Sequence, residues 1–504
     1  MKADFQHITA SKNAMRRSLA KRPFAEKVRL LEELSERTLA TRKDTSLPLP
    51  NEPWPIPDYW QWSTMGDVAT VVGGGTPKTD RAEYFGGAVP WITPADLSGY
   101  HDKTISRGSR NITEEGLANS GARLLPASTV LFSSRAPIGY VAIAANPVAT
   151  NQGFKSFILK SHLDSSFVYY YLQRAKPLAT ALASGTTFLE ISGKNAARLP
   201  IPVPPLAEQR QIVAEIEKQF TRLEAGVAAL RRVQANLKRY RAGVLKAACE
   251  GRLVPTEAEL ARTEGRSYEP ADQLLARILT ERRQKWSGRG QYKEAAAPNL
   301  SNVPPLPEGW GLVSLDQLCL KITDGEHLSP QTEAEGVYLL SAKDVRESGV
   351  RFDDPKFVSP EDAANFRKRC DPSCGDVLIV SRGATIGRVC VVQTDEIFCL
   401  MGSVILLKPG GLLPGKFLGI CLSNQNAKMK LIAASGSTAQ QAIYLRDITS
   451  FAIALPPAAE QERIVVEVDR HLSVIDQLES VVAANLQRAT RLRQSILGRA
   501  FSSK

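Results

Sequence analysis

The chain has 504 residues, more than a single hydrophobic core usually serves, so several domains are expected. Its net charge of +12 and pI near 9.3 favour a polyanionic partner, although many basic proteins merely carry solvated basic faces. No apolar run approaches the roughly 18 residues that span a bilayer, and residues 1–12 lack a signal-peptide core. We therefore expect a cytoplasmic protein without a membrane segment.

The first segment, residues 1–53, contains one predicted helix and a proline-rich linker. The helix covers residues 24–41 and begins after Pro23. Its apolar side chains recur on one side: Phe24, Val28, Leu31 and Leu34. The linker covers residues 47–57, and the sequence does not indicate what this helix packs against.

Residues 54–204 alternate apolar, strand-like runs with glycine turns, which predicts a globular domain. Its glycine run ends in Gly75-Thr76-Pro77-Lys78, which looks suited to phosphate. The run lacks the spacing of a P-loop, and the proline prevents a helix from starting at once. The sequence therefore does not predict a nucleotide-phosphate loop here.

Residues 205–250 predict a central spacer helix, because the sequence after Pro205 contains no proline up to residue 250. From residue 207 to residue 247 such a helix would be about 60 Å long. Its apolar residues step by threes and fours in a narrow stripe: Ile212, Ile216, Phe220, Leu223, Val227, Leu230, Leu237 and Val244. Basic residues outnumber acidic ones, especially beyond Leu230. Those clusters fit either a solvated or partner-facing surface or a contact with DNA phosphate.

The chain then repeats the same plan. A helix over residues 271–286 and a polar linker fill residues 251–303, a second domain covers 304–455, and a second spacer helix covers 456–504. Matching pairs occur in the same order: Ile56 to Trp60 with Leu306 to Trp310, Val130 to Arg135 with Val377 to Arg382, and Pro204 to Gln209 with Pro456 to Gln461. The sequence therefore predicts two copies of one module.

The second spacer keeps the apolar stripe, with Glu479 as its one charged break. The stripe residues are Ile464, Val468, Leu472, Ile475, Val482 and Ile496. Packing of one spacer helix on the other explains both stripes most simply. Packing against helices of a partner protein uses the same residues and remains an alternative.

No catalytic motif is evident. The chain lacks HExxH, GxSxG, paired CxxC, GxGxxG after a strand, and the Asn-Pro-Pro-aromatic tetrad of adenine methyltransferases. Its five histidines form no repeated triad, and all seven cysteines follow Arg241 without a metal-ligand spacing. We predict reduced, structural thiols, no metal site and no catalytic residue.

The ordered motifs resemble the specificity (S) subunit of type I restriction-modification systems. They are the runs Trp62 to Val68, Gly74 to Pro77, Val89 to Ile92, Ile112 to Leu117 with Ser120, Asn151 to Lys155, and Leu206 to Arg210. The second module departs from these motifs, because residues 323–327 replace the Gly-Gly-Thr-Pro loop and residues 400–403 replace Asn-Gln-Gly-Phe. Such divergence is expected if the modules recognise different bases.

The resemblance implies an α+β fold with two mixed α/β target recognition domains separated by two long antiparallel, coiled-coil-like helices. Each domain would bind one half of a bipartite sequence in double-stranded DNA, and the helices would fix the gap. Two modification (methyltransferase) and two restriction (endonuclease and translocase) subunits would assemble around the chain. S-adenosylmethionine, ATP and magnesium would bind those partners, and this chain would need no cofactor and have no catalytic role.

Candidate DNA-binding residues are the polar and basic side chains of loops, since arginine, asparagine and glutamine contact base edges while lysine, serine and threonine contact phosphates. In the first domain they are Thr76, Lys78, Thr79, Arg81, Arg107, Arg110, Ser134, Arg135, Asn151, Gln152, Lys155, Thr186, Thr187 and Lys194. In the second they are Thr323, His327, Lys343, Arg382, Ser437, Thr438, Gln440, Gln441 and Arg446. The repeated arginines Arg135 and Arg382 fit a shared scaffold as well as base recognition.

A rival interpretation is a non-catalytic coiled-coil adaptor or scaffold whose globular domains bind protein. It accounts for the helices and the duplication. It does not account for the basic surplus or the ordered motifs.

Overall fold

The computed structural model describes residues 52–185, 189–286, 290–298, 305–328, 330–433 and 441–502. The chain divides into two compact units, one running through Gly226 and resuming at Arg488, the other spanning Val227–Gln487. The predicted helix over residues 24–41 lies outside the described residues, as do part of the linker before the second domain and five candidate residues, Thr186, Thr187, Ser437, Thr438 and Gln440.

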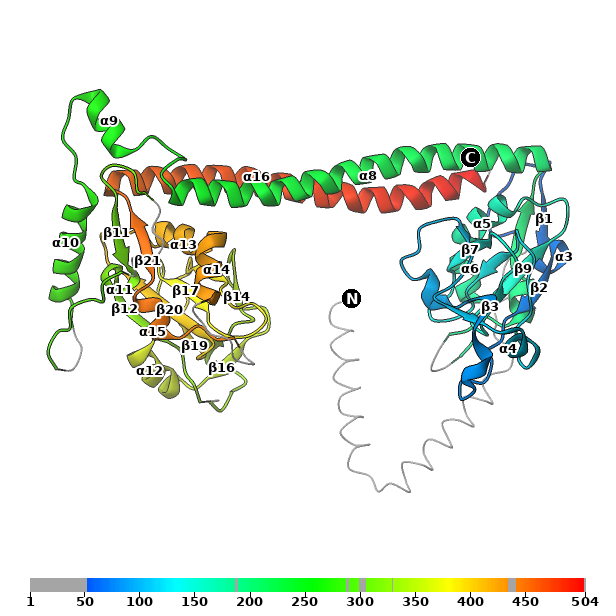
Figure 1. Ribbon diagram of the computed structural model, residues 1–504, viewed down its shortest axis with the longest axis horizontal. Coiled ribbons are helices and arrows are strands. Elements are labelled where there is room, and N and C mark those ends of the chain that lie inside the picture. The colour runs from blue at the N-terminus through cyan, green and yellow to red at the C-terminus, as the bar shows by residue number, and fades with distance from the viewer. Residues whose placement is uncertain are drawn as a thin grey trace, which may run out of the picture. The chain divides into compact units, whose positions relative to one another are not determined.

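The first domain is built from three sheets (Figure 1). Its strands are β1 (Gln61–Thr64), β2 (Ala69–Gly73), β3 (Phe85–Ile92), β4 (Thr104–Ile105), β5 (Arg110–Ile112), β6 (Val130–Phe132), β7 (Val141–Ala144), β8 (Ala149–Thr150), β9 (Lys155–Leu159) and β10 (Pro200–Val203). The sheet orders are β2-β9-β6-β7-β4, β5-β3-β8 and β1-β10. Its helices are α3 (Met65–Val68), α4 (Glu114–Ala118), α5 (Ser165–Arg174), α6 (Lys176–Ala181) and α7 (Gly193–Ala197).

The second domain repeats this topology. Its strands are β11 (Gly311–Ser314), β12 (Cys319–Asp324), β13 (Val337–Leu340), β14 (Val345–Arg346), β15 (Gly349–Val350), β16 (Lys356–Val358), β17 (Val377–Val380), β18 (Val389–Val391), β19 (Phe398–Leu400), β20 (Val404–Pro409) and β21 (Ala452–Leu455). The orders β12-β20-β17-β18, β16-β13-β19 and β11-β21 match those of the first domain, except that the first domain's main sheet has a fifth strand, β4, beside β7. In the second domain β14 and β15 form a separate two-stranded sheet. Its helices are α9 (Glu257–Glu264), α10 (Ala271–Gln284), α11 (Leu315–Leu318), α12 (Pro360–Arg369), α13 (Gly415–Ser423), α14 (Gln425–Ala433) and α15 (Leu445–Thr449).

Equivalent residues begin the fold in both domains. Thr64 closes a capping box at the start of α3, and Ser314 does the same at α11, so each short strand turns at once into a short helix. Large side chains then fill the cores. In the first domain α5 packs against β6 and β7 and buries an unbroken run of large side chains from Phe167 to Leu172.

Two long helices, α8 (Leu206–Cys249) and α16 (Ala458–Ala500), follow the two domains in sequence. Their contacts show that they run antiparallel, because Glu224 pairs with Arg493 while Arg241 pairs with Asp476 and Glu479. The predicted fold class is therefore confirmed. The charged break at Glu479 in the second stripe is matched by Arg241, 3.4 Å away.

The predicted stripe residues divide into three groups. Ile212, Ile216, Phe220, Leu223 and Ile496 pack into the first domain's core, and Val244, Ile464, Val468 and Leu472 pack into the second domain's core. A purely helix–helix cluster contains Leu230, Leu237, Leu472, Ile475 and Val482. Val227 is half-buried. Along each helix the same stripe therefore supplies residues to both domain cores and, between them, to the contact with the other helix.

The repeated Pro-Pro-x-x-Glu-Gln motif joins each domain to its helix. The Gln209 side chain is fully buried, donates to the carbonyls of Pro204 and His162, and accepts from the Asp164 amide. Gln461 is equally buried and donates to the Pro456 carbonyl. Because buried amides are generally hydrogen-bonded, the bonds of Gln209 hold the first turn of α8 against the first domain. The buried amide oxygen of Gln461 has no hydrogen-bond partner among the described residues.

The preceding glutamate differs between the copies. Glu460 is buried, where it accepts from Trp310 Nε1 and from the amide of Glu257 at the start of α9, and burial raises the pKa of its carboxyl. Glu208 instead accepts from the exposed Tyr59 hydroxyl. The α9 segment therefore covers the helix start in the second module.

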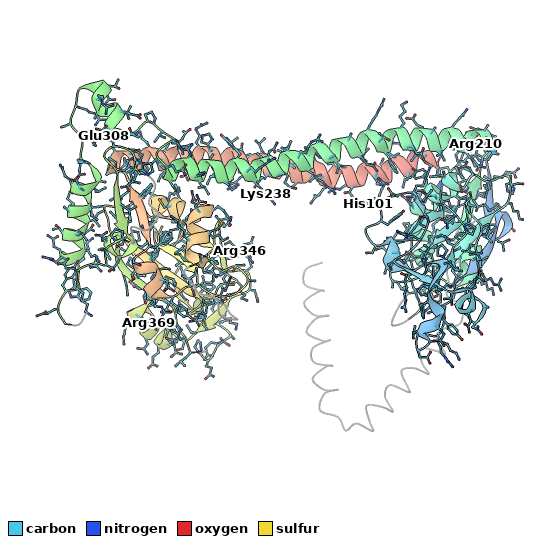
Figure 2. All side chains as sticks on the ribbon, in the orientation of Figure 1. His101, Arg210, Lys238, Glu308, Arg346 and Arg369 are labelled. Atoms are coloured by element: carbon cyan, nitrogen blue, oxygen red, sulfur yellow. The ribbon has the colours of Figure 1, made fainter. Side chains whose placement is uncertain are left out.

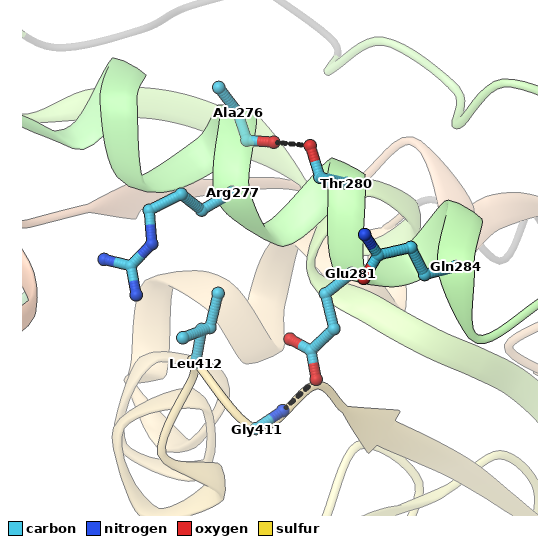
Figure 3. Close-up of a pocket in the computed structure, with 7 residues that line it drawn as sticks. All are labelled: Ala276, Arg277, Thr280, Glu281, Gln284, Gly411 and Leu412. Atoms are coloured by element: carbon cyan, nitrogen blue, oxygen red, sulfur yellow. Dashed lines mark hydrogen bonds between the residues drawn. The ribbon is translucent and has the colours of Figure 1, made fainter.

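Helix α10 lies against α11 and β11 and buries Leu274 and Ile278 in the second core. Arg282 pairs with Asp316 at 2.9 Å, and Glu281 accepts from the Gly411 amide at 3.0 Å beside a shallow hollow (Figure 3). Within the residues described, no helix is both long and apolar enough to cross a membrane.

Candidate nucleic-acid interface

In the first domain the Gly-Gly-Thr-Pro and Asn-Gln-Gly-Phe motifs lie against each other. A side chain at Gly74 would place its Cβ 1.9 Å from the carbonyl oxygen of Asn151, so only glycine permits this approach. The Gly75 amide donates to the Thr150 carbonyl, and the Thr76 hydroxyl donates to the amide oxygen of Gln152. The two motifs together form one polar loop surface.

A carboxylate joins three candidate residues at this surface. Glu190 lies 3.3 Å from Lys155 Nζ, 3.5 Å from an Arg135 nitrogen and 3.4 Å from the Ser134 hydroxyl. The backbones of Arg135 and Glu190 also form a β-bridge. The cluster contains two cations and one anion, so its net charge is positive. A positive charge favours contact with a DNA phosphate or with an acceptor atom of a base.

The other candidates of the first domain are distributed around the fold. Asn151 is half-buried and its side chain accepts from the Gly153 amide. Exposed side chains are Lys78, Thr79, Arg81, Arg107, Arg110 and Lys194. Arg110 lies 3.7 Å over the Phe85 ring, and Lys194 belongs to α7. Ser134 is fully buried, so its side chain is not placed to contact DNA and serves the scaffold instead.

The second domain keeps the loop juxtaposition with different residues. A Cβ at Gly325 would lie 2.1 Å from the Leu400 carbonyl oxygen. Across the two loops the Glu326 amide donates to the Leu400 carbonyl, and the Gly402 amide donates to the Glu326 carbonyl. The replacement of both sequence motifs therefore preserves the backbone and changes only the chemistry that it presents.

An ion-paired cluster occupies this surface in the second domain. The Asp324 carboxylate, largely buried, pairs with Arg369 and lies 2.9 Å from His327 Nε2. In the first domain the strand register places Gly73 at the position of Asp324. A neutral, small-residue loop in one module thus corresponds to a charged loop in the other.

The remaining candidates of the second domain are less concentrated. Lys343 bonds Asp354 at 2.8 Å, and this hydrogen bond raises the pKa of the lysine. Arg382 and Gln441 are exposed, and Arg446 lies 5.0 Å from the Tyr444 ring. Thr323 is buried in β12, which removes its side chain from the accessible surface.

Sequence inspection missed Glu190, Asp324 and Arg369. The Glu190–Arg135 and Arg369–Asp324 pairs join residues far apart in sequence, so no local pattern signals those contacts. Among the described residues no group of His, Cys, Asp and Glu side chains is arranged to hold a metal ion. The surface offers hydrogen-bond donors, acceptors and positive charge, which suits recognition of a nucleic acid.

Comparison with known proteins supports this assignment. A family model described as type I restriction modification DNA specificity domain matches residues 57–229 and 307–486. The specificity subunit of the type I restriction enzyme MjaIX from Methanocaldococcus jannaschii is 45% identical over 160 residues, which are 31% of this chain and 37% of that protein. The EcoBI specificity subunit from Escherichia coli is 24% identical over 450 residues, 88% of this chain and 86% of that protein.

A solved chain from work on complex assembly and conformational transition of the type I R-M system shares the fold. It superimposes with a TM-score of 0.60 at 20% identity, over 90% of this chain and all of that one. The family model covers one segment in each of the two repeated modules, and together these segments exceed half of the sequence. The chain therefore belongs to the family of type I restriction-modification DNA specificity proteins.

Proposed function

We propose that this chain is the sequence-specific DNA-binding subunit of a type I restriction-modification complex. Each domain binds one half of a bipartite target in double-stranded DNA, and α8 and α16 set the gap between the halves. The observation that carries this proposal is the loop surface that occurs twice on one backbone with different chemistry. A repeated scaffold with divergent contact residues is what recognition of two different half-sites requires.

The reactions belong to other subunits in this proposal. Two modification subunits methylate adenine with S-adenosylmethionine, and two restriction subunits cleave and translocate DNA with ATP and magnesium. The chain itself is non-catalytic and acts in the cytoplasm by placing these partners. The sequence contains none of the catalytic motifs named above, which supports assigning methylation and cleavage to the partner subunits.

An apolar row on α16 supports docking of modification subunits. Val474, Leu478 and Val481 lie on one face of the helix, and their side chains are 45–55% exposed. The buried seam residues Ile475 and Val482 lie beside them. A second helical seam adjoining the first is the arrangement that a bundle with partner helices needs.

Charging this row should abolish the docking. For the double variant Leu478→Glu/Val481→Glu we expect at least a tenfold weaker association with the modification subunit, because two carboxylates would be buried at the contact. Co-purification and light scattering of the mixed subunits would measure it. The matched control Gln477→Glu/Ser480→Glu adds the same charges at neighbouring exposed positions. Equal behaviour of the two variants would exclude this row as the docking site.

The function itself is tested by single-molecule sequencing of DNA from cells that express the modification subunit with or without this chain. We expect adenine methylation at an asymmetric two-part motif with a fixed gap, only when the chain is present. If the modification subunit is active with another specificity partner but produces no new motif with this chain, the protein-binding adaptor becomes the better explanation.

A further inference from the structure

A pre-positioned arginine lies on the loop surface of the second domain. Arg369 ends α12, and its side chain is 51% exposed (Figure 2). Asp324 binds one terminal nitrogen of its guanidinium, and the Asp324 side chain itself is only 13% exposed. The arginine is therefore held at its inner edge while the outer part of the guanidinium faces outward.

The carboxylate that orients Arg369 belongs to a strand of the second domain's central sheet. Asp324 is the last residue of β12, which pairs with β20 in the central sheet. His327 lies 2.9 Å from the second oxygen of the same carboxylate, so Asp324 is contacted from two sides. A largely buried carboxylate with two partners fixes its own position and that of the guanidinium.

The chemistry of the exposed part selects a base. A guanidinium has five N–H donors, and one interaction with Asp324 leaves enough for a two-pronged contact. Guanine is the base that presents two acceptors, O6 and N7, side by side in the major groove. Adenine presents an N–H donor beside its N7, and this donor repels one of the two N–H groups of the guanidinium.

We infer that Arg369, oriented by Asp324, recognises a guanine in the half-site of the second domain. This inference rests on the proposed DNA-binding function and specifies one of its base contacts. The first domain carries Gly73 at the Asp324 position and has no carboxylate there to orient such an arginine. The guanine therefore belongs to one half-site, and its recognition does not extend to the other.

The test uses the full chain in complex with its modification subunit, acting on synthetic duplexes in which each position of the second half-site is varied. For wild-type protein we expect one position where guanine is preferred. A duplex with 7-deazaguanine at that position, which lacks the N7 acceptor, should be methylated at its target adenine about tenfold or more slowly. Arg369→Ala should lose this preference and show no further loss with 7-deazaguanine. Arg369→Lys keeps the positive charge but lacks the paired N–H donors of a guanidinium, so this variant should also lose the preference for guanine.

Two further variants separate orientation from charge. Asp324→Asn removes the anionic brace and should weaken discrimination at the same position only. Lys368→Ala removes a neighbouring exposed cation of α12 and should leave every base preference unchanged.

The inference is overturned if Arg369→Ala retains the wild-type preference at all positions. It is also overturned if that variant slows methylation of every sequence equally, which would indicate a phosphate contact. Failure of the wild-type complex to methylate any bipartite motif is a different outcome and would overturn the proposed function itself.

Discussion

Four helix-forming residues inserted after Ala228 should lengthen the gap in the methylated motif and leave both half-sites unchanged. Ala228 is an exposed residue within the long helix α8. Four residues add about 6 Å to a helix, and one base pair rises about 3.4 Å, so the gap should grow by roughly one to two base pairs. Motif mapping of genomic DNA by single-molecule sequencing measures the gap directly.

The insertion also rotates the helix by only about 40° beyond a full turn, which the apolar seam can accommodate by a shift along α16. As a control, the same four residues inserted after Gly290, an exposed residue between α10 and β11, should leave the gap unchanged. An unchanged gap in the α8 variant would show that helix length does not set it. A changed half-site would show instead that the insertion disturbs a recognition domain.

Much of the architecture could be predicted because it depends on periodicity and repetition. The proline-free stripes identified α8 and α16, and the repeated Trp60 and Trp310 motifs marked the first strand of each domain. These signals are local in sequence. The antiparallel pairing needed the family resemblance, since a heptad stripe alone does not fix helix direction.

The candidate interface was less predictable because its contacts join distant segments. Loop position and residue type pointed to Thr76, Gln152 and Arg135, but the anchoring Glu190 follows Arg135 by more than fifty residues. The sequence also did not predict that Ser134 and Thr323 are buried. A polar residue next to an apolar run can be assigned to a loop until the strand register is known. Residue type predicted the chemistry of the site, and the tertiary fold decides which side chains reach the surface.

The end of α16 also carries a role that its sequence did not indicate. Phe501 is fully buried in the first domain, with its ring 5.2 Å from Phe167 and 5.4 Å from Tyr171. Its carbonyl oxygen accepts a hydrogen bond from Trp54 Nε1. Residues near both ends of the described chain therefore complete one core.

Replacing this ring should selectively destabilise the first domain. For Phe501→Ala we expect a loss of about 3–5 kcal/mol, because a large cavity opens in a closely packed core. Since a chain of two units does not unfold in one step, hydrogen exchange followed by mass spectrometry is the suitable measurement. Strands β6 and β9 should exchange faster, while β17 and β20 of the second domain keep their protection. Leu492→Ala, at an exposed site of α16 before Phe501, should change the free energy of exchange by less than about 0.5 kcal/mol. Similar exchange in the two variants would mean that the end of α16 adds little to the first domain, and faster exchange in both domains would mean that the two units unfold together.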